Sequence, residues 1–295
     1  MNKLNQQLSF KDEIINNNIV PMIGVYDVFS AALAVQYFNT IFCSGYGFSA
    51  SYYGLPDEGY IAWSDMVSYI ERIRSVLPSN KHIVVDIDDG YGDPKLAADV
   101  VKRLERVGAS AVIIEDQRRP KKCGHLPGKE ILDLDEYLIR LNSVLKARNK
   151  MFVIGRTDTP KFEDAIYRVK EFKKAGVDGI LVEGIDDISK IPLIRQAVGD
   201  QIAITINLIE GGKTDPISWS ELEKLGVNLI NYSTPCLFSA HGAINNKLKK
   251  LIKDNGSLLY DKDDIDLNNI QEGVKLEDAA NKWFEYFGHT GIYFE

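Results

Sequence analysis

Acidic residues follow apolar runs of the sequence at points where buried strands would end. Asp86 and Asp88 lie at the end of HIVVDID, and Glu115 lies at the end of AVIIED. Residues two apart on a strand point to the same face, so both aspartates would face one way beside Glu115. Carboxylates this close repel one another unless a cation lies between them. We therefore predict a site for Mg²⁺, which binds oxygen ligands and keeps several waters, over the alternative that these acids cap loops or pair with Lys and Arg.

An arginine and two polar residues occupy similar positions further along the chain. Arg156 lies near the end of MFVIGRTD, Glu183 near the end of GILVEG, and Asn207 at the end of IAITIN. A guanidinium at the end of a buried strand needs an anion, and its planar fork suits a carboxylate or a phosphate. A structural ion pair with Asp158 or Glu183 is the alternative. Glu183 and Asn207 could complete a polar ring around a bound ligand.

A cysteine lies in a cationic segment shortly after the fourth apolar run. QRRPKKCGHLPGKE contains five Lys and Arg side chains together with His125 and several proline and glycine residues, so it predicts a loop. A thiol there could belong to a metal site, a redox site, a nucleophile or a proton donor. Lys122 and His125 flank Cys123 and should favour the thiolate. A loop that closes over a substrate would deliver Cys123 while excluding water.

The composition excludes several classes of protein. The chain has 295 residues and a net charge of −7, whereas nucleic-acid-binding proteins carry clustered basic surface. The polar segment MNKLNQQLSFKDEIINNN does not resemble a signal peptide, and no apolar run is long enough to span a bilayer. The three cysteines lack CxxC spacing, which argues against a disulfide framework and a structural zinc site. We expect a cytoplasmic protein with reduced thiols that binds neither nucleic acid nor membrane.

Short apolar, β-branched runs alternate with longer amphipathic segments between residues 19 and 256. Continuous apolar runs of this kind indicate strands buried on both faces, as in a parallel sheet. PKLAADVVKRLERVG and KFEDAIYRVKEFKKAG predict helices that end at Gly108 and Gly176. Eight such units in about 250 residues are typical of an α/β fold of the (β/α)8 TIM-barrel type. An open doubly wound sheet is the rival, but no GxGxxG follows the first run. The predicted strands are IVPMIGVY (from Ile19), TIFCSG (from Thr40), HIVVDID (from His82), AVIIED (from Ala111), MFVIGRTD (from Met151), GILVEG (from Gly179), IAITIN (from Ile202) and LINYS (from Leu229).

The chain divides into two expected parts. Residues 1–256 should form the catalytic barrel, and residues 257–295 a C-terminal helical extension. Within the extension, LEDAANKWFEYF has the pattern of a short amphipathic helix in which Trp283, Phe284 and Phe287 need cover. That helix should pack on the barrel or on a neighbouring subunit.

A barrel would gather the polar residues at one place, because active sites of this fold form at the carboxyl ends of the strands. Ser44 and Gly45 end the second apolar run and would join the acids and Arg156 there. The sequence therefore predicts one polar site at the mouth of the barrel.

Five segments resemble the isocitrate lyase/phosphoenolpyruvate mutase superfamily: EDQRRPKKCGH, GLPDEG, DIDDGYGD, GRTD and NLIEGGKT. Together they cover most of the predicted barrel. The signature K-[KR]-C-G-H is specific and marks the carbon–carbon lyase members of the superfamily. The resemblance implies a (β/α)8 barrel whose last helices are exchanged between subunits in a homotetramer, a dimer of dimers.

The resemblance also implies a metal site and a substrate pocket. Mg²⁺, or Mn²⁺ in its place, would be held mostly through waters by Asp86, Asp88 and Glu115, with Asp57 as a neighbour. A small carboxylate would bind at a turn formed by Ser44, Gly45 and Tyr46. The implied substrate-binding residues are Ser44, Gly45, Tyr46, Gly124, His125, Arg156, Glu183 and Asn207, and the implied catalytic residues are Cys123, Lys122, His125, Arg156 and Tyr46.

The implied reaction is cleavage of a carbon–carbon bond in a 2-oxo or 2-hydroxy carboxylate. A base takes the hydroxyl proton, the bond breaks in a retro-aldol (retro-Claisen) step, and Cys123 protonates the enolate-like leaving carboxylate. Mg²⁺ would lower the pKa of the hydroxyl group. The base stays open between a metal-bound hydroxide and Tyr46.

The segment after Asn207 narrows the substrate. EGGKT resembles the branch of 2,3-dimethylmalate lyase, petal death protein and carboxyphosphonoenolpyruvate phosphonomutase. Isocitrate and methylisocitrate lyases tend to carry N-x-[ST]-E-F-G, whereas NLIEGG places Ile209 where a hydroxyl would be. A third substrate carboxylate would lose a hydrogen-bond partner there. We therefore expect a lyase that acts on a malate-type, alkyl-substituted 2-hydroxy dicarboxylate.

Other interpretations stay open. A phosphonomutase of the same branch also carries K-R-C-G-H, and an oxaloacetate hydrolase or a methylisocitrate lyase would use the same scaffold. A non-catalytic barrel kept for binding or assembly is disfavoured, because Asp86, Asp88, Cys123 and Arg156 are all present. Four aromatic residues depart from the family's small and aliphatic ones and could either reshape the pocket or pack between subunits: Tyr52, Tyr53, Tyr60 and Trp63.

Overall fold

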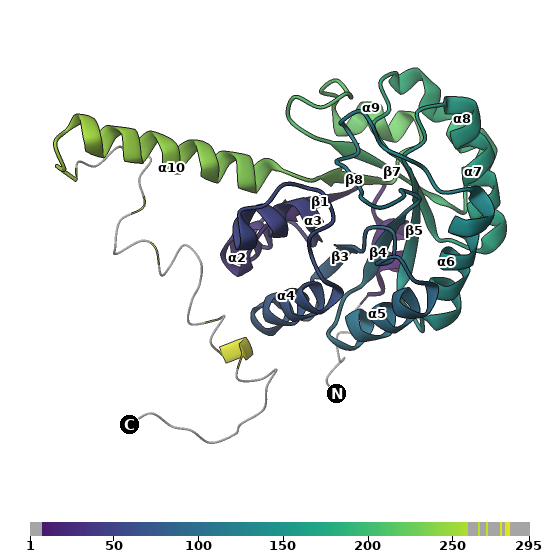
Figure 1. Cartoon of the computed structure of the whole chain (residues 1–295), viewed down its shortest axis with the longest axis horizontal. Coiled ribbons are helices and arrows are strands. Elements are labelled where there is room, and N and C mark those ends of the chain that lie inside the picture. Colours follow the sequence, from purple (N-terminus) through teal and green to yellow (C-terminus); the bar gives the residue numbers. More distant parts are fainter. Residues whose placement is uncertain (1–7, 259–264, 266–269, 271–277, 279–280, 284–295) are drawn as a thin grey trace.

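Eight parallel strands form a closed barrel in the computed structural model of the chain, which describes residues 8–258, 265, 270, 278 and 281–283 (Figure 1). Each strand pairs with the next one along the chain, and β8 closes the barrel on β1 through pairs such as Met22 and Asn231. The predicted (β/α)8 barrel is confirmed, and this closure excludes the open sheet. The strands are β1 (Val20–Val25), β2 (Thr40–Cys43), β3 (His82–Asp86), β4 (Ala111–Glu115), β5 (Phe152–Thr157), β6 (Gly179–Val182), β7 (Ala203–Leu208) and β8 (Leu229–Tyr232).

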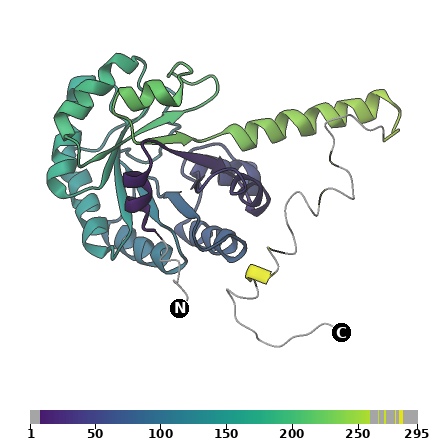
Figure 2. The same ribbon diagram turned by 180° about the vertical axis from the view of Figure 1, so that it is seen from behind.

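Helices surround the barrel on its outer face (Figures 1 and 2). The α-helices are α1 (Phe10–Asn16), α2 (Val28–Ala34), α3 (Gly45–Phe48), α4 (Trp63–Val76), α5 (Pro94–Arg106), α6 (Leu134–Ala147), α7 (Phe162–Ala175), α8 (Ile191–Val198), α9 (Trp219–Lys224) and α10 (Pro235–Lys253). Two short helices add to them: a π-helix η1 (Ser49–Tyr53) and a 3₁₀-helix η2 (Ile188–Lys190).

The sequence signals for helix ends are confirmed at α5 and α7. The carboxylate of Asp93 accepts hydrogen bonds from the first backbone N–H groups of α5, and Pro94 occupies its first turn. α5 ends just before Gly108, and α7 ends at Gly176; both glycines have a left-handed φ, of 90° and 100°. Residues with a Cβ rarely adopt this conformation, so each glycine terminates its helix.

Two apolar layers hold the fold together. The larger one lies between the strands and the surrounding helices and includes fully buried side chains such as Ile70, Leu104 and Phe172. The smaller one fills the barrel and includes Met22 and Ile154. Burial of apolar surface stabilises the fold by roughly 25 cal/mol per Å², so these layers supply most of the rigidity on which a site can be built.

Helix α1 closes the amino-terminal end of the barrel. Its residue Phe10 belongs to the inner apolar layer and packs against Phe152 in an edge-to-face contact, with ring centroids 5.2 Å apart. The Phe10 ring also lies 5.3 Å from the imidazole of His82. Ser9 and Asp12 cap this helix reciprocally through their side chains and backbone N–H groups. The predicted elements begin with the first strand, so the sequence analysis does not include this helix.

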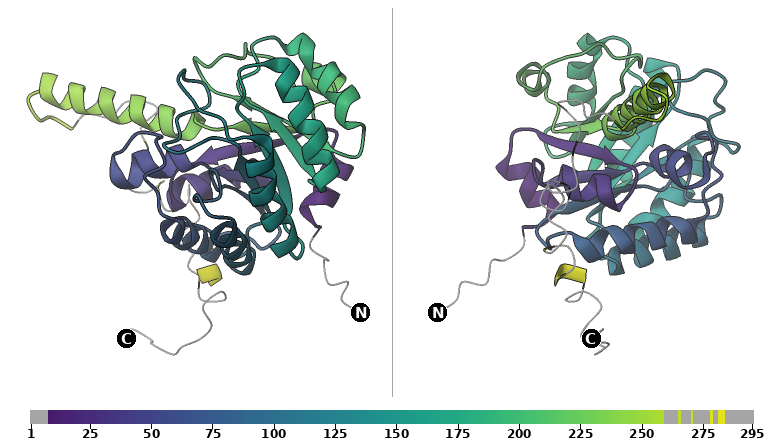
Figure 3. Two further views of the ribbon diagram at one scale, coloured as in Figure 1. Left: turned by 45° about the vertical axis from the view of Figure 1, so that its right-hand side comes forward. Right: turned by 90° about the vertical axis from the view of Figure 1, so that its left-hand side faces the viewer.

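Helix α10 projects away from the barrel (Figures 1 and 3). None of its 19 residues is buried, and Phe238, Ile244, Leu248 and Ile252 are exposed. Exchange of terminal helices between subunits, the homotetramer and the domain boundary at residue 256 therefore stay predictions. Trp283 of the predicted tail helix is partly exposed, whereas Phe284 and Phe287 lie outside the described residues.

Candidate active site

The predicted polar residues meet at the carboxyl-terminal end of the barrel. Asp86 and Glu115 are the last residues of β3 and β4, Arg156 lies near the end of β5, and Asn207 near the end of β7. Glu183 directly follows β6. All of them are buried in spite of their charge or polarity. Buried charged groups must be paired or bind a ligand, so the contacts of these side chains define what the site can do.

Two aspartates of this site surround a buried lysine. The ammonium of Lys121 lies 2.8 Å from Asp57 Oδ1 and 2.6 Å from Asp88 Oδ1, and the residue is only 3% exposed. Burial lowers the pKa of Lys121, but the carboxylates of Asp88 and Asp57 outweigh it and raise the pKa well above its ordinary value. Lys121 was not among the predicted residues, because the sequence could not tell which lysine of KKCGH points inward.

The negative charges of Asp86 and Glu115 are less well compensated by nearby cations and donors than those of Asp57 and Asp88. Asp86 Oδ1 accepts a hydrogen bond from the backbone N–H of Asp88, 3.0 Å away, and burial raises the pKa of Asp86 to about 6. Glu115 Oε1 is buried and has no hydrogen-bond partner within the described part of the chain, and burial raises the pKa of Glu115 well above its ordinary range. Additional positive charge near these oxygens would stabilise both carboxylates.

These carboxylates suit a hard cation that keeps part of its water shell. In the part of the chain that the structure describes, no three His, Cys, Asp or Glu side chains are arranged to hold an ion directly. Mg²⁺ binds oxygen ligands and usually retains several waters, which would bridge such distances. The partnerless oxygen of Glu115 and the raised pKa of Asp86 therefore fit the predicted ion, and Mg²⁺ itself stays a proposal.

Arg156 forms the ion pair that the sequence left as an alternative. Its Nε lies 2.8 Å from Asp158 Oδ2, and its Nη2 lies 3.0 Å from Asp158 Oδ1 and 3.2 Å from Glu115 Oε2. The backbone N–H of Asp158 donates to Asp116 Oδ1, which fixes Asp158 in turn. These contacts use Nε and Nη2, and among the described residues Nη1 has no ion-pair or hydrogen-bond partner. The pairing thus orients the guanidinium and leaves one edge for an anion.

A chain of polar side chains continues around the barrel from β6 to β8. His125 Nε2 lies 3.0 Å from Glu183 Oε1, which also accepts a hydrogen bond from Asn207 Nδ2 at 2.8 Å. The hydroxyl of Ser233 donates to Asn207 Oδ1, and Asn231 donates to Ser233. Burial would raise the pKa of Glu183, but Arg156 and His125 outweigh it and hold the pKa at about 2. Glu183 is therefore an anion whose position is fixed from three sides.

Residues 117–131, here called the Cys123 loop, cover this end of the barrel. Gln117 and Ile131 form a bridge at its base, and the Gln117 side chain exchanges two hydrogen bonds with the backbone of Lys122. His125 Nδ1 accepts a hydrogen bond from the backbone N–H of Lys213, in the segment after β7. The loop is therefore attached to the barrel at both ends and near its middle.

The Cys123 side chain of this loop is partly buried. Its environment does not favour the predicted thiolate. Burial raises the pKa of its thiol, and the backbone N–H of His125 only partly offsets this effect. Lys122 is not among the groups that act most strongly on the pKa of this thiol, and its ammonium lies beside Gly128. A thiol that stays protonated at neutral pH can donate a proton, which favours an acid over a nucleophile.

The predicted carboxylate-binding turn lies next to the acids. The Ser44 hydroxyl accepts a hydrogen bond from Gly47 N–H and caps α3. A Cβ on Gly45 would lie 3.4 Å from Asp88 Oδ1, so the backbone approaches this carboxylate closely here. Tyr46 packs edge-to-face on Phe238 of α10, with centroids 6.4 Å apart. Burial, together with Cys123 and Asp57, raises the pKa of Tyr46.

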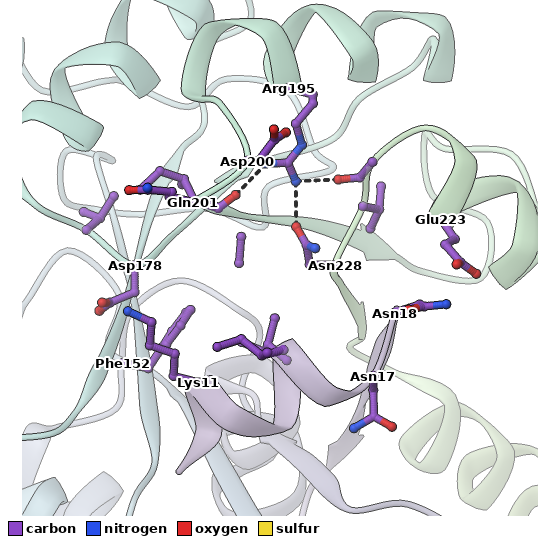
Figure 4. Close-up of a pocket in the computed structure, with 17 residues that line it drawn as sticks. Lys11, Asn17, Asn18, Phe152, Asp178, Arg195, Asp200, Gln201, Glu223 and Asn228 are labelled. Carbon is purple, nitrogen blue, oxygen red and sulfur yellow. Dashed lines mark hydrogen bonds between the residues drawn. The ribbon is translucent and has the colours of Figure 1, made fainter.

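A second cavity lies away from these residues. It has a volume of about 910 Å³ and opens at the amino-terminal end of the barrel, between α1 and the starts of β5 and β7 (Figure 4). Arg195 donates there to Asn228 and to backbone carbonyl groups, and so connects the loop between α8 and β7 with the loop between α9 and β8. None of the predicted site residues lines this cavity, which is therefore distinct from the candidate active site.

A family model described as phosphoenolpyruvate phosphomutase matches residues 10–252. The chain belongs to the isocitrate lyase/phosphoenolpyruvate mutase superfamily. Petal death protein of Dianthus caryophyllus is 33% identical over 277 residues, which cover 90% of this chain and 83% of that protein. The predicted superfamily is thereby confirmed, and the chain is an enzyme of the lyase and mutase type.

Solved structures of superfamily members have the same fold. A crystal structure of 2,3-dimethylmalate lyase superposes with a TM-score of 0.85 at 29% identity and covers 95% of both chains. Oxaloacetate acetylhydrolase in complex with 3,3-difluorooxalacetate superposes with a TM-score of 0.86 at 28% identity, over 96% of this chain and 97% of that one. Relatives with different activities are thus about equally similar, so the choice among activities depends on the site.

Proposed function

We propose that this enzyme is a divalent-metal-dependent lyase that cleaves a malate-type 2-hydroxy dicarboxylate, with alkyl substituents, into a 2-oxo acid and a carboxylate. The observation that carries the proposal is the partly buried Cys123 thiol, whose pKa burial raises, in a loop beside buried carboxylates and Arg156. The similarity to 2,3-dimethylmalate lyase supports this class of substrate.

Asp86, Asp88 and Glu115, with Asp57 beside them, would hold the metal ion. When bound, Mg²⁺ would lower the pKa of the substrate hydroxyl and stabilise negative charge that develops on oxygen. Mn²⁺ has similar ligand preferences and could replace it. Lys121 now lies between Asp57 and Asp88, so we expect its ammonium to shift when an ion is bound.

The substrate would bind by its two carboxylates. One would lie at the turn of Ser44, Gly45 and Tyr46, which the Gly45 geometry places beside Asp86 and Asp88. The other would meet the free edge of Arg156, with Gly124, His125, Glu183 and Asn207 around it. The guanidinium is held in place by Asp158 before the substrate arrives, and such preorganisation lowers the cost of binding.

Bond cleavage then requires a base and an acid. The base removes the hydroxyl proton, the carbon–carbon bond breaks, and its electron pair moves to the carbon next to the leaving carboxylate. The Cys123 S–H gives its proton to that carbon, and the resulting thiolate regains a proton from water when the loop opens. The raised pKa of Tyr46 makes its phenolate scarce at neutral pH, which disfavours Tyr46 as the base.

The segment after β7 supports a dicarboxylate over a tricarboxylate. Ile209 lies two residues after Asn207, and its backbone carbonyl accepts a hydrogen bond from Gly212 in a tight turn. An apolar side chain there can contact an alkyl branch but cannot donate a hydrogen bond to a third carboxylate. This supports a substituted malate over methylisocitrate.

Hydrolysis of oxaloacetate is the second candidate. Its support is the fold similarity to oxaloacetate acetylhydrolase and the hydrogen-bonded chain of Glu183, Asn207 and Ser233, which could orient a water molecule. A phosphonomutase reaction on the same scaffold stays a third outcome of the test below.

The test is a substrate panel followed by NMR. The enzyme with Mg²⁺ is incubated with C2- and C3-alkyl malates, oxaloacetate, methylisocitrate and phosphonates, and Cys123→Ser is run in parallel. We expect a substituted malate to give a 2-oxo acid and a carboxylate, and the variant to lose about 10²–10⁴-fold in kcat, the usual contribution of a general acid.

Two results would contradict the proposal. If only oxaloacetate or a phosphonate is turned over, the reaction class is wrong. If Cys123→Ser keeps full activity on a malate, the thiol is not the acid. Metal removal is a separate test: if the enzyme keeps full activity without a divalent metal, Asp86, Asp88 and Glu115 do not have the role assigned to them.

A further inference from the structure

A lysine at the far end of the Cys123 loop is buried against the candidate site. The side chain of Lys129 is 9% exposed, and its ammonium donates a hydrogen bond to the carbonyl oxygen of Gly124. The same ammonium lies 3.3 Å from Asp158 Oδ1. Gly124 directly follows Cys123, and Asp158 is the carboxylate that orients Arg156. One cation therefore joins the backbone beside the thiol to the group that fixes the guanidinium.

The loop lies in direct contact with the site at Gly124. A Cβ added to this residue would lie 2.3 Å from Glu183 Cγ, 2.6 Å from Arg156 Nη2 and 2.8 Å from Asp158 Oδ1. No side chain could occupy that space without displacing the loop. The position of Gly124, and with it that of Cys123, is therefore tightly defined in this conformation.

The neighbouring part of the loop has little other support. Leu126, Pro127 and Gly128 line a cavity of about 750 Å³ together with residues 158–162 after β5. Side chains that line a cavity gain fewer packing contacts than side chains in a close-packed core. On this side, the loop is attached to the barrel by the polar contacts of Lys129 and by those of His125 with Glu183 and Lys213.

We propose that Lys129 is a positioning residue that holds the Cys123 loop in its closed conformation, by bridging the Gly124 carbonyl and the Asp158 carboxylate. This inference deepens the proposed function, since the closed loop is the one that presents the thiol to the substrate. Opening the loop to admit substrate separates Lys129 from Gly124 or from Asp158. The base of the loop stays joined, because Arg118 N–H donates to the Glu130 carbonyl independently of Lys129.

Lys129→Met and Lys129→Arg test the bridge. Methionine keeps the length of the side chain but cannot donate a hydrogen bond, whereas arginine keeps the charge and the donors. Lys161→Ala is the matched control, because Lys161 lines the same cavity from the opposite side and is exposed.

The primary readout is the alkylation rate of each cysteine in the substrate-free enzyme, measured by mass spectrometry over a range of pH. Cys43 and Cys236 serve as internal references. The plateau rate at high pH reports access to the thiol, whereas a changed thiol pKa would only displace the profile. We expect Lys129→Met to raise the plateau rate of Cys123 about ten- to hundredfold, as expected for loss of a hydrogen bond to a charged group. Lys129→Arg should show a smaller rise, and Lys161→Ala none.

Two outcomes would overturn the proposal. An unchanged Cys123 rate in Lys129→Met would show that the bridge does not hold the loop. A joint rise for all three cysteines would show that Lys129 stabilises the fold as a whole and does not act on the loop. Because alkylation requires no turnover, either result can be told apart from failure of the lyase assignment, which only the substrate panel tests.

Discussion

At the scale of single residues, the proposed reaction depends on the protonation of the Cys123 thiol. The sequence predicted thiolate character from the flanking Lys122 and His125, but the structure partly buries the thiol, and burial raises its pKa. Burial disfavours a charged group, and here that effect outweighs the helpful backbone N–H of His125. Spacing along the chain placed Cys123 in a cationic loop but could not supply the environment of its thiol.

This environment predicts the direction of the pH dependence. In the proposed mechanism the acid form of Cys123 is the active one, so kcat should fall as pH rises through a thiol pKa above the ordinary value of about 8.5. The alkaline limb of the kcat profile should therefore lie above that value, and a fall beginning near neutral pH would contradict it. The measurement is kcat from about pH 6 to about pH 10, with Cys123→Ser as the control that lacks this limb.

Lys121 gives a second residue-scale prediction. Lys121→Met removes the cation between Asp57 and Asp88 and leaves two buried carboxylates without it. Loss of one partner of a buried pair commonly costs about 3–5 kcal/mol, so the metal-free variant should unfold at a lower temperature than the parent.

Addition of Mg²⁺ distinguishes the loss of the Lys121 charge from a general loss of stability. Mg²⁺ should raise the Tm of Lys121→Met by more than that of the parent, because the ion would replace the missing charge. Calorimetry with and without Mg²⁺ checks this, and Lys122→Met is the matched variant in which no such difference is expected. An equal Mg²⁺ effect in both variants would argue against ion binding beside Asp57 and Asp88.

At the scale of elements, the strands and their order were predictable because their signal is local. Runs such as HIVVD and AVIIE are buried on both faces and are continuous in sequence. The contacts between elements were not predictable in the same way. The hydrogen bonds from Ser233 to Asn207 and from Lys213 to His125 depend on which loops meet at the barrel mouth. Only the closed topology brings these residues together.

Helix α1 is an element whose role became visible only in the structure, and it gives a stability prediction. Phe10→Ala should destabilise the protein by about 3–5 kcal/mol, because it opens a cavity under the inner layer of the barrel. The site lies at the opposite end, so kcat at saturating substrate should change little. Urea unfolding measures the effect, with Ile15→Ala of the same helix as the control, since Ile15 is exposed. A stable Phe10→Ala variant would show that α1 is dispensable.

At the scale of the whole molecule, helix α10 carries exposed apolar side chains away from the barrel. Its 19 residues extend from the barrel without a buried side chain, and Ile244 and Leu248 are four apart on one exposed face. Exposure of such an apolar face to water is unfavourable, and the predicted homotetramer would cover it.

Ile244→Lys combined with Leu248→Lys should therefore lower the molecular mass measured by light scattering, whereas Asn245→Lys, on another face, should leave it unchanged. Because Tyr46 packs on Phe238 at the base of this helix, loss of assembly should also lower activity. An unchanged mass in the double variant would mean that α10 does not mediate assembly.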